Sequence, residues 1–132
     1  MGSLHGVICQ ACGTSFSVRD GGGFFFDLLH CDACGRVTTV SHQDLGDIHL
    51  RYIKGLGRPY AVARAEMDRR IQAEYQGEPL SRADYQVAAA ATLAPCPCGG
   101  RFGYDAPARC PSCRSTSESW THDPAAASAL YD

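Results

Sequence analysis

The sequence lacks long apolar stretches and a recognisable leader segment. Its longest apolar stretches lie at residues 24–29 and 85–95, well short of the roughly 20 residues that span a bilayer. The N-terminus has neither a basic region nor an apolar run long enough for a secretory signal. We therefore expect a soluble cytoplasmic protein with no membrane association.

The sequence also lacks an excess of basic charge. Lys54 is the only lysine, and 12 basic residues stand against 14 acidic ones, which gives a formal net charge of −2. This charge disfavours non-specific nucleic-acid binding. The preference for arginine and alanine is typical of a GC-rich bacterial genome.

Common catalytic motifs are absent as well. There is no P-loop, dinucleotide fingerprint, nucleophile elbow or His-Glu-x-x-His pattern. No basic helix follows the glycines at 21–23, which predicts a hairpin turn rather than a phosphate loop. The densest ionisable group, His42, Asp44, Asp47 and His49, has no nucleophile beside it and is expected to be the solvated start of a helix. The sequence thus predicts a protein that is not an enzyme.

What the chain does have is eight cysteines in four close pairs. In a reducing compartment, paired cysteines indicate metal ligation rather than disulfides, although a secreted, disulfide-bonded domain remains the alternative. Two sulfurs on one tight turn can both approach an ion at about 2.3 Å. We expect two Zn²⁺ ions, bound by the pairs that are nearest in sequence. The predicted site 1 comprises Cys9, Cys12, Cys31 and Cys34, and site 2 comprises Cys96, Cys98, Cys110 and Cys113.

The knuckles Cys9-x-x-Cys12-Gly13 and Cys31-x-x-Cys34-Gly35 resemble those of the zinc-ribbon and rubredoxin-like families. The resemblance covers one segment at each end of the chain and leaves the middle unmatched. It implies a four-cysteine zinc site, with iron as a substitute. The layout is also similar to small bacterial proteins with a ribbon at each end, a resemblance that implies no particular activity.

Two features of the cysteine pattern leave alternatives open. Cys96 and Cys98 are separated by one residue where family knuckles have two, so zinc binding competes here with a thiol-redox role. His30, next to Cys31, is a substitute ligand in principle. We expect it instead to be a strand residue or to donate a hydrogen bond to one of the metal ligands. With four sulfurs per ion and no open position, the predicted sites are structural rather than catalytic.

The predicted fold class is small, metal-stabilised α+β, with two zinc β-ribbons joined by two to three helices. Strands at 14–19 and 24–30 are expected to form a hairpin around 20–23. Helical periodicity over 44–57 and 60–75, and a capping pattern at Ser81, predict the helices. The expected divisions are a ribbon at 1–40, a helical midsection at 41–94, a ribbon at 95–121 and a flexible tail at 122–132.

The aromatic residues suggest a binding surface. A two-stranded hairpin cannot cover both faces of the Phe24 to Phe26 segment, so either the helices fold over it or a partner docks on it. Nearby arginine and aromatic side chains in the second ribbon extend this candidate surface. Its residues are Phe24, Phe25, Phe26, Arg101, Phe102, Tyr104, Arg109 and Arg114.

These observations favour a non-catalytic zinc-binding protein that acts as a protein-binding adaptor, regulator or assembly factor. Nucleic-acid binding is the first alternative, because arginines lie beside stacking aromatics in the second ribbon. A thiol-redox or rubredoxin-like electron-transfer module is the second alternative.

Overall fold

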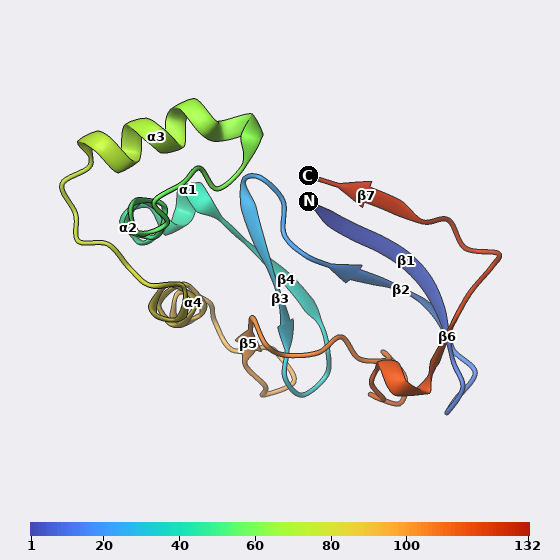
Figure 1. Ribbon diagram of the computed structural model, residues 1–132. Coiled ribbons are helices and arrows are strands. Elements are labelled where there is room, and N and C mark those ends of the chain that lie inside the picture. Colours follow the sequence, from blue (N-terminus) through green and yellow to red (C-terminus); the bar gives the residue numbers. More distant parts are fainter. The chain divides into compact units, whose positions relative to one another are not determined.

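Seven strands and four α-helices make up the chain, which the computed structural model describes over residues 1–132 (Figure 1). The fold is α+β, as predicted. The strands are β1 Gly2–Cys9, β2 Ser15–Asp20, β3 Phe26–Cys31, β4 Val37–Ser41, β5 Phe102–Gly103, β6 Trp120–His122 and β7 Ala129–Tyr131. The helices are α1 His42–Leu45, α2 Asp47–Gly55, α3 Ala65–Glu74 and α4 Arg82–Ala91, with short 3₁₀ turns at Val62–Arg64 and Ser117–Ser119.

The chain divides into two compact units. One contains Met1–Thr39 together with Ala94–Asp132, and the other contains Val40–Leu93. The helical unit lies close to the midsection expected from the sequence. The N- and C-terminal segments, however, form one β unit instead of the two separate ribbons that the sequence predicted, because their strands and knuckles pair with each other.

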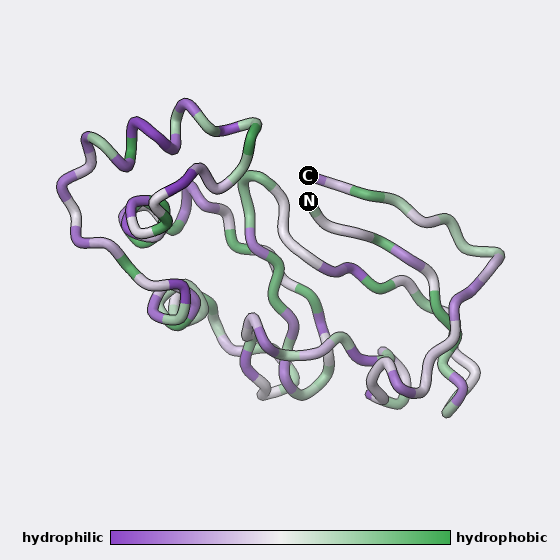
Figure 2. The backbone as a smooth tube through the Cα atoms, viewed as in Figure 1, coloured by the Kyte–Doolittle hydropathy of each residue, from purple (hydrophilic) through white to green (hydrophobic).

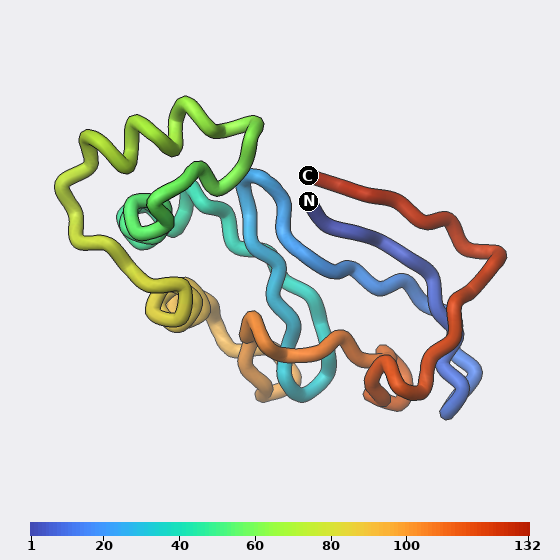
Figure 3. The backbone as a smooth tube through the Cα atoms, viewed as in Figure 1, coloured from blue at the N-terminus to red at the C-terminus, as the bar shows by residue number.

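The first sheet of the β unit is built around β1. On one side β1 pairs with β2 in antiparallel fashion, and on the other side it pairs with β6 at one end and β7 at the other. The two chain termini consequently lie side by side (Figure 3). Residues 122–132, expected to be a flexible tail, instead carry β7. Tyr131 holds this end in place, because its hydroxyl donates a hydrogen bond to Gly21 O at 2.8 Å and also lies 3.1 Å from Asp20 O.

The second sheet has the order β4-β3-β5. Its central strand β3 is covered on both faces, with Leu28, Leu29, His30 and Cys31 all buried. The predicted hairpin between 14–19 and 24–30 is therefore wrong: both segments contain strands, but β2 pairs with β1 and β3 belongs to the other sheet. In the segment expected to form the second ribbon, β5 pairs with β3.

The helical unit contains no cysteine and has a small apolar core that includes Leu45, Ile53, Tyr85 and Ala89. The predicted cap of α4 is confirmed, since Ser81 Oγ accepts a hydrogen bond from the Asp84 N–H at 3.1 Å. None of the helices combines the length and the apolar composition that crossing a bilayer requires.

The helices differ in two respects from those expected from the sequence over 44–57 and 60–75. The first predicted helix is interrupted at Gly46, whose φ of 53° is left-handed, so α1 and α2 are separate. In α3 and the turn before it the buried residues are polar rather than apolar. Met67 is 54% exposed, whereas Arg64 and Asp68 are buried four residues apart, and α3 shows mostly hydrophilic colours in Figure 2.

Candidate metal centres

All four cysteine pairs share the same backbone turn. In each knuckle the N–H of the first cysteine donates to the carbonyl of the residue two positions after the second cysteine, at 2.8–2.9 Å. The residue directly after the second cysteine donates its N–H to the carbonyl of the first. The shorter Cys96-Pro-Cys98 knuckle keeps both bonds, so its missing residue does not prevent it from presenting two sulfurs.

A left-handed residue follows every knuckle. Gly13 and Gly35 have φ values of 78° and 74°, and Gly99 has 91°. Arg114 occupies the equivalent position in the fourth knuckle with φ 64° and is the only non-glycine residue with positive φ. Positive φ is costly for a residue with a Cβ, so this turn is imposed by the surrounding structure.

The structure groups the sulfurs differently from the sequence prediction. One four-sulfur group contains Cys9, Cys12, Cys110 and Cys113, and the other contains Cys31, Cys34, Cys96 and Cys98. The first pair thus meets the last, and the second meets the third, in a nested arrangement. We call these the outer cluster and the inner cluster. All eight predicted ligands are in a group, but the predicted partition into sites 1 and 2 is wrong.

Hydrogen bonds around the first and fourth knuckles account for the outer cluster. Gln10 N–H donates to Ser119 O at 2.6 Å, and Thr14 Oγ1 donates to Ser112 Oγ at 2.9 Å. The Ser115 hydroxyl lies 3.1 Å from Cys9 Sγ and also contacts Cys113 Sγ. Because β6 pairs with the end of β1, the fourth knuckle, which precedes β6, lies next to the first knuckle, which begins at that end of β1.

The inner cluster is held together by backbone pairing between the second and third knuckles. Asp32 N–H donates to Arg101 O, and Arg101 N–H donates back to Asp32 Oδ1, both at 2.9 Å. Gly100 lies against the cluster, because a Cβ there would come within 2.5 Å of Cys31 Sγ. The register of β5 on β3, with Phe102 opposite Cys31, places these two knuckles together.

The sulfur geometry fits a tetrahedral ion. Within each group all four Sγ atoms lie within 4.8 Å of one another, and the nearest sulfurs of different knuckles are 3.6 Å apart in the outer cluster and 3.5 and 3.7 Å apart in the inner one. Four sulfurs about 2.3 Å from a central ion would be separated by about 3.8 Å, whereas a disulfide bond is about 2.05 Å long. Each group could therefore hold one metal ion.

Burial and local hydrogen bonds set the acidity of individual thiols. The Ser115 hydroxyl, aided by nearby backbone N–H groups, lowers the pKa of Cys9 to about 6. For Cys31, burial acts to raise the pKa, but backbone N–H groups and the neighbouring sulfurs lower it to about 6. For Cys96, the backbone N–H of Cys98 acts to lower the pKa, yet burial and the surrounding sulfurs raise it to about 12. Each cluster thus includes one thiol that readily forms the thiolate, the form that binds metal.

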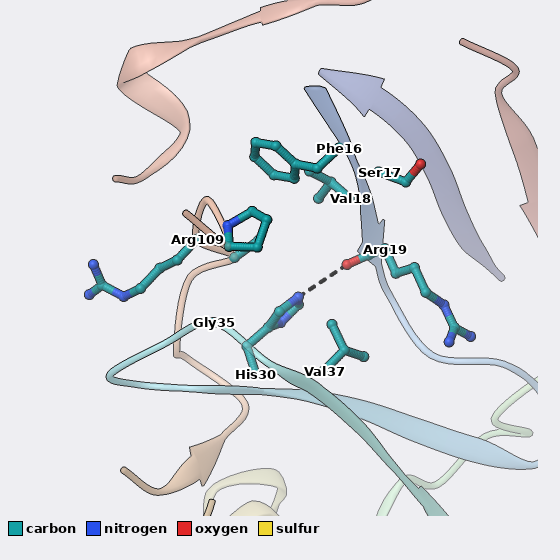
Figure 4. Close-up of a pocket in the computed structure, with 10 residues that line it drawn as sticks. Phe16, Ser17, Val18, Arg19, His30, Gly35, Val37 and Arg109 are labelled. Carbon is teal, nitrogen blue, oxygen red and sulfur yellow. Dashed lines mark hydrogen bonds between the residues drawn. The ribbon is translucent and has the colours of Figure 1, made fainter. Parts of the chain in front are cut away.

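His30 is not in either sulfur group. It is buried in β3, and its Nε2 donates a hydrogen bond to Arg19 O of β2 at 3.1 Å, which links the two sheets (Figure 4). Beside this bond is a pocket of about 150 Å³ between β2, β4 and the segment before the fourth knuckle. Sequence reasoning missed this pocket, because its walls come from four separate stretches of the chain.

The candidate partner surface is divided among several environments. Phe25 is 62% exposed, while Phe26 stacks on Tyr131 with ring centroids 6.1 Å apart. Tyr104 donates a hydrogen bond to Asp27 at 2.7 Å. Phe24 is half-buried and precedes β3. The other members lie near the last two knuckles: Phe102 is in β5, Arg101 and Arg114 are exposed, and Arg109 is half-buried.

The hydroxyl groups of Thr14, Ser112 and Ser115 were not singled out from the sequence. Serine and threonine are common in loops, so their type alone gives no signal. Their positions one or two residues from a cysteine are the only hint, since a side chain there can reach the sulfurs of a facing knuckle.

Comparison of the chain with curated proteins and with solved structures gives no match. A family model does match, over residues 5–119. The matched range includes all eight cysteines and the whole helical unit. The family is described as a domain of unknown function (DUF8255), and because the match covers most of the sequence, the chain belongs to this family.

Proposed function

We propose that each cluster binds one Zn²⁺ and that the protein is a non-catalytic, zinc-stabilised protein that binds a protein partner. The observation that carries the zinc assignment is the convergence of four sulfurs within 4.8 Å in each group. Thiolate is a preferred donor for zinc, and four thiolates complete its tetrahedral coordination. Iron is the competing metal, since it accepts the same donor set.

A structural role follows from the donor set. A catalytic zinc normally keeps one position open for water or substrate, and here four protein sulfurs would fill all four positions. The first cysteine of every pair is buried, including Cys9 and Cys110 in the outer cluster and Cys31 and Cys96 in the inner one. The zinc would therefore tie the N- and C-terminal segments together rather than face a substrate.

Protein binding is proposed because the closed clusters offer no place for chemistry and the charge disfavours the main alternative. The net charge of −2 becomes more negative when thiolates bind zinc, which opposes contact with nucleic-acid phosphates. Cys98 Sγ lies 3.5 Å from Cys31 Sγ, and Cys96 Sγ lies 3.7 Å from Cys34 Sγ. This four-sulfur grouping supports metal ligation over an isolated redox pair at Cys96 and Cys98.

Metal analysis of protein purified without oxygen tests the first half of the proposal. We expect two zinc ions per chain, and Co²⁺ substitution should give the spectrum of tetrahedral sulfur coordination. A coloured, redox-active iron centre would replace zinc in the assignment, and fewer than two bound metal ions would contradict it.

Affinity purification tests the second half. The zinc-loaded protein should retain a protein partner that the double variant Cys12→Ser, Cys113→Ser does not retain. A nucleic-acid column run at low salt is the control, because retention there, lost at higher salt, would favour the nucleic-acid alternative instead.

A further inference from the structure

Strand β2 has a hydrogen-bonding partner on only one side, β1. The Cys9 N–H to Thr14 O bond fixes which residues of β2 bond to β1. Because bonding alternates along an antiparallel pair, Ser15, Ser17 and Arg19 direct their backbone N–H and C=O groups away from β1. These residues form the outer edge of β2.

Most of this edge is unused. The carbonyl of Arg19 accepts the hydrogen bond from His30, so this carbonyl is not available to another strand. The backbone groups of Ser15 and Ser17 make no hydrogen bond, and both residues are exposed. An open strand edge is a template for another extended segment, and two outward residues spaced two apart match the repeat of an added strand.

The pocket lies beside this edge. The Phe16 and Val18 side chains of β2 form one wall, with Val37 opposite (Figure 4). Pro111 also lines the pocket. Its volume of about 150 Å³ corresponds to about five water molecules and is well below the roughly 300–1,000 Å³ of small-molecule sites. The size therefore suits one apolar side chain rather than a cofactor.

The charges around the pocket are positive. Arg19 and Arg109 lie on opposite sides of it, and no aspartate or glutamate lines it (Figure 4). Neither arginine forms an ion pair. Arg109 Nη1 donates to Arg114 O, but its Nε is buried without a hydrogen-bond partner. The two guanidinium groups therefore carry positive charge with no carboxylate paired to them, and carboxylates are the strongest acceptors for arginine.

We propose that the outer edge of β2 binds an extended acidic segment of a partner protein as an added strand. Its backbone pairs with Ser15 and Ser17, one apolar side chain enters the pocket, and its carboxylates face Arg19 and Arg109. A second copy of this chain is a poorer occupant, because β2-to-β2 pairing would bring two copies of the same unneutralised arginine together. This inference rests on the proposed protein-binding function and names the surface and the partner chemistry.

A random peptide library displayed on phage is the probe, selected on the zinc-loaded protein. The matched variants are Ser17→Pro, which removes an outward N–H without touching the bonds to β1, and Ser17→Thr, which keeps that N–H. Arg109→Gln and Arg19→Gln remove one charge each. Zinc content and the fluorescence of Trp120, the one tryptophan, verify that each variant is folded.

We expect selected peptides to be enriched in acidic residues around an apolar one. They should bind Ser17→Pro about tenfold more weakly than wild type, because a main-chain hydrogen bond is lost, while Ser17→Thr binds normally. The arginine variants should bind several-fold more weakly, with a reduced salt dependence. Amide protons of Ser15 and Ser17 should also become protected from exchange when peptide binds.

Three results would overturn the inference: no selected binders, binders without acidic enrichment, or equal binding to Ser17→Pro and wild type. In the last case the protein still binds peptides through another surface, so the proposed function stands while the β2 edge is excluded. A protein dimer that dissociates in Ser17→Pro would assign this edge to self-association instead.

Discussion

The β unit and the helical unit reach stability by different routes. The β unit, which has all eight cysteines, joins two distant segments of the chain, and several of its strands have only two or three residues. The helical unit is one continuous segment, lacks cysteine and relies on an apolar core and buried polar contacts. Val7, Val18, Leu28 and Leu29 give the β unit a small apolar core. Short strands add little stability by themselves, so the proposed metal ions would stabilise contacts that are distant in sequence.

Metal removal should give the largest difference in stability between the β unit and the helical unit. Structural zinc contributes on the order of 10 kcal/mol per site to folding, and we expect a strong chelator to unfold the β unit while helices α2 to α4 persist. Trp120, in the β unit, reports the loss by fluorescence, and far-ultraviolet circular dichroism reports the helices. Simultaneous loss of both signals would show that the helical unit also depends on the metal.

Pairs of cysteine substitutions should distinguish nested clusters from consecutive ribbons. Cys12→Ser with Cys113→Ser affects only the outer cluster, so one metal ion per chain should remain. Cys12→Ser with Cys34→Ser damages both clusters, so both ions should be lost or bound weakly. Metal content after gel filtration gives the answer, and consecutive ribbons would give the opposite results.

Within the helical unit, Asp68→Ala should have a large effect. Asp68 is fully buried, its Oδ2 accepts the Tyr60 N–H at 2.9 Å, and its Oδ1 lies 3.7 Å from Arg64 Nη2. Removing one partner of a buried ion pair costs about 3–5 kcal/mol. Urea unfolding followed by circular dichroism measures this.

The control for Asp68→Ala is Glu74→Gln in the exposed pair with Arg70. This change should alter the free energy of unfolding by less than about 1 kcal/mol. Equal effects of the two substitutions would mean that Asp68 is not part of the core of the helical unit.

Two glycine substitutions should give smaller, graded effects in the β unit. Gly13 and Gly35 have nearly the same positive φ, but a Cβ at Gly35 would come within 2.5 Å of Arg109, whereas nothing lies within 4 Å at Gly13. Gly13→Ala should cost about 1–2 kcal/mol from backbone strain alone, and Gly35→Ala should cost more. Thermal unfolding of the zinc-loaded variants measures the difference; similar costs would contradict the close approach of Arg109.

Local features were predictable from the sequence because local chemistry determines them. The paired sulfurs, the left-handed Gly13 and Gly35, and the Ser81 cap each follow from a few adjacent residues. The strand in 26–31 was also expected, from its apolar and aromatic residues.

The partners of these elements could not be predicted in the same way. Which knuckles meet depends on hydrogen bonds between distant segments, such as that between Asp32 and Arg101. The sequence shows none of these bonds, so the prediction assumed that the cysteine pairs nearest in sequence bind the same ion. Strand β1 was overlooked because its glycines and serine disfavour a strand, and β7 because its segment is rich in alanine; in both, pairing with neighbouring strands overrides intrinsic propensity.

The nested pairing also has a consequence for the order of events during synthesis. Cys9 and Cys12 are synthesised before the helical unit, but Cys110 and Cys113, the pair that completes their cluster, are synthesised after it. Translation adds about 5–20 residues per second, so the first thiols wait for many seconds while the helical unit has time to fold. A nascent chain that stops before Cys96 can complete neither cluster, so under the zinc proposal the outer site would be complete only after the fourth cysteine pair has been synthesised.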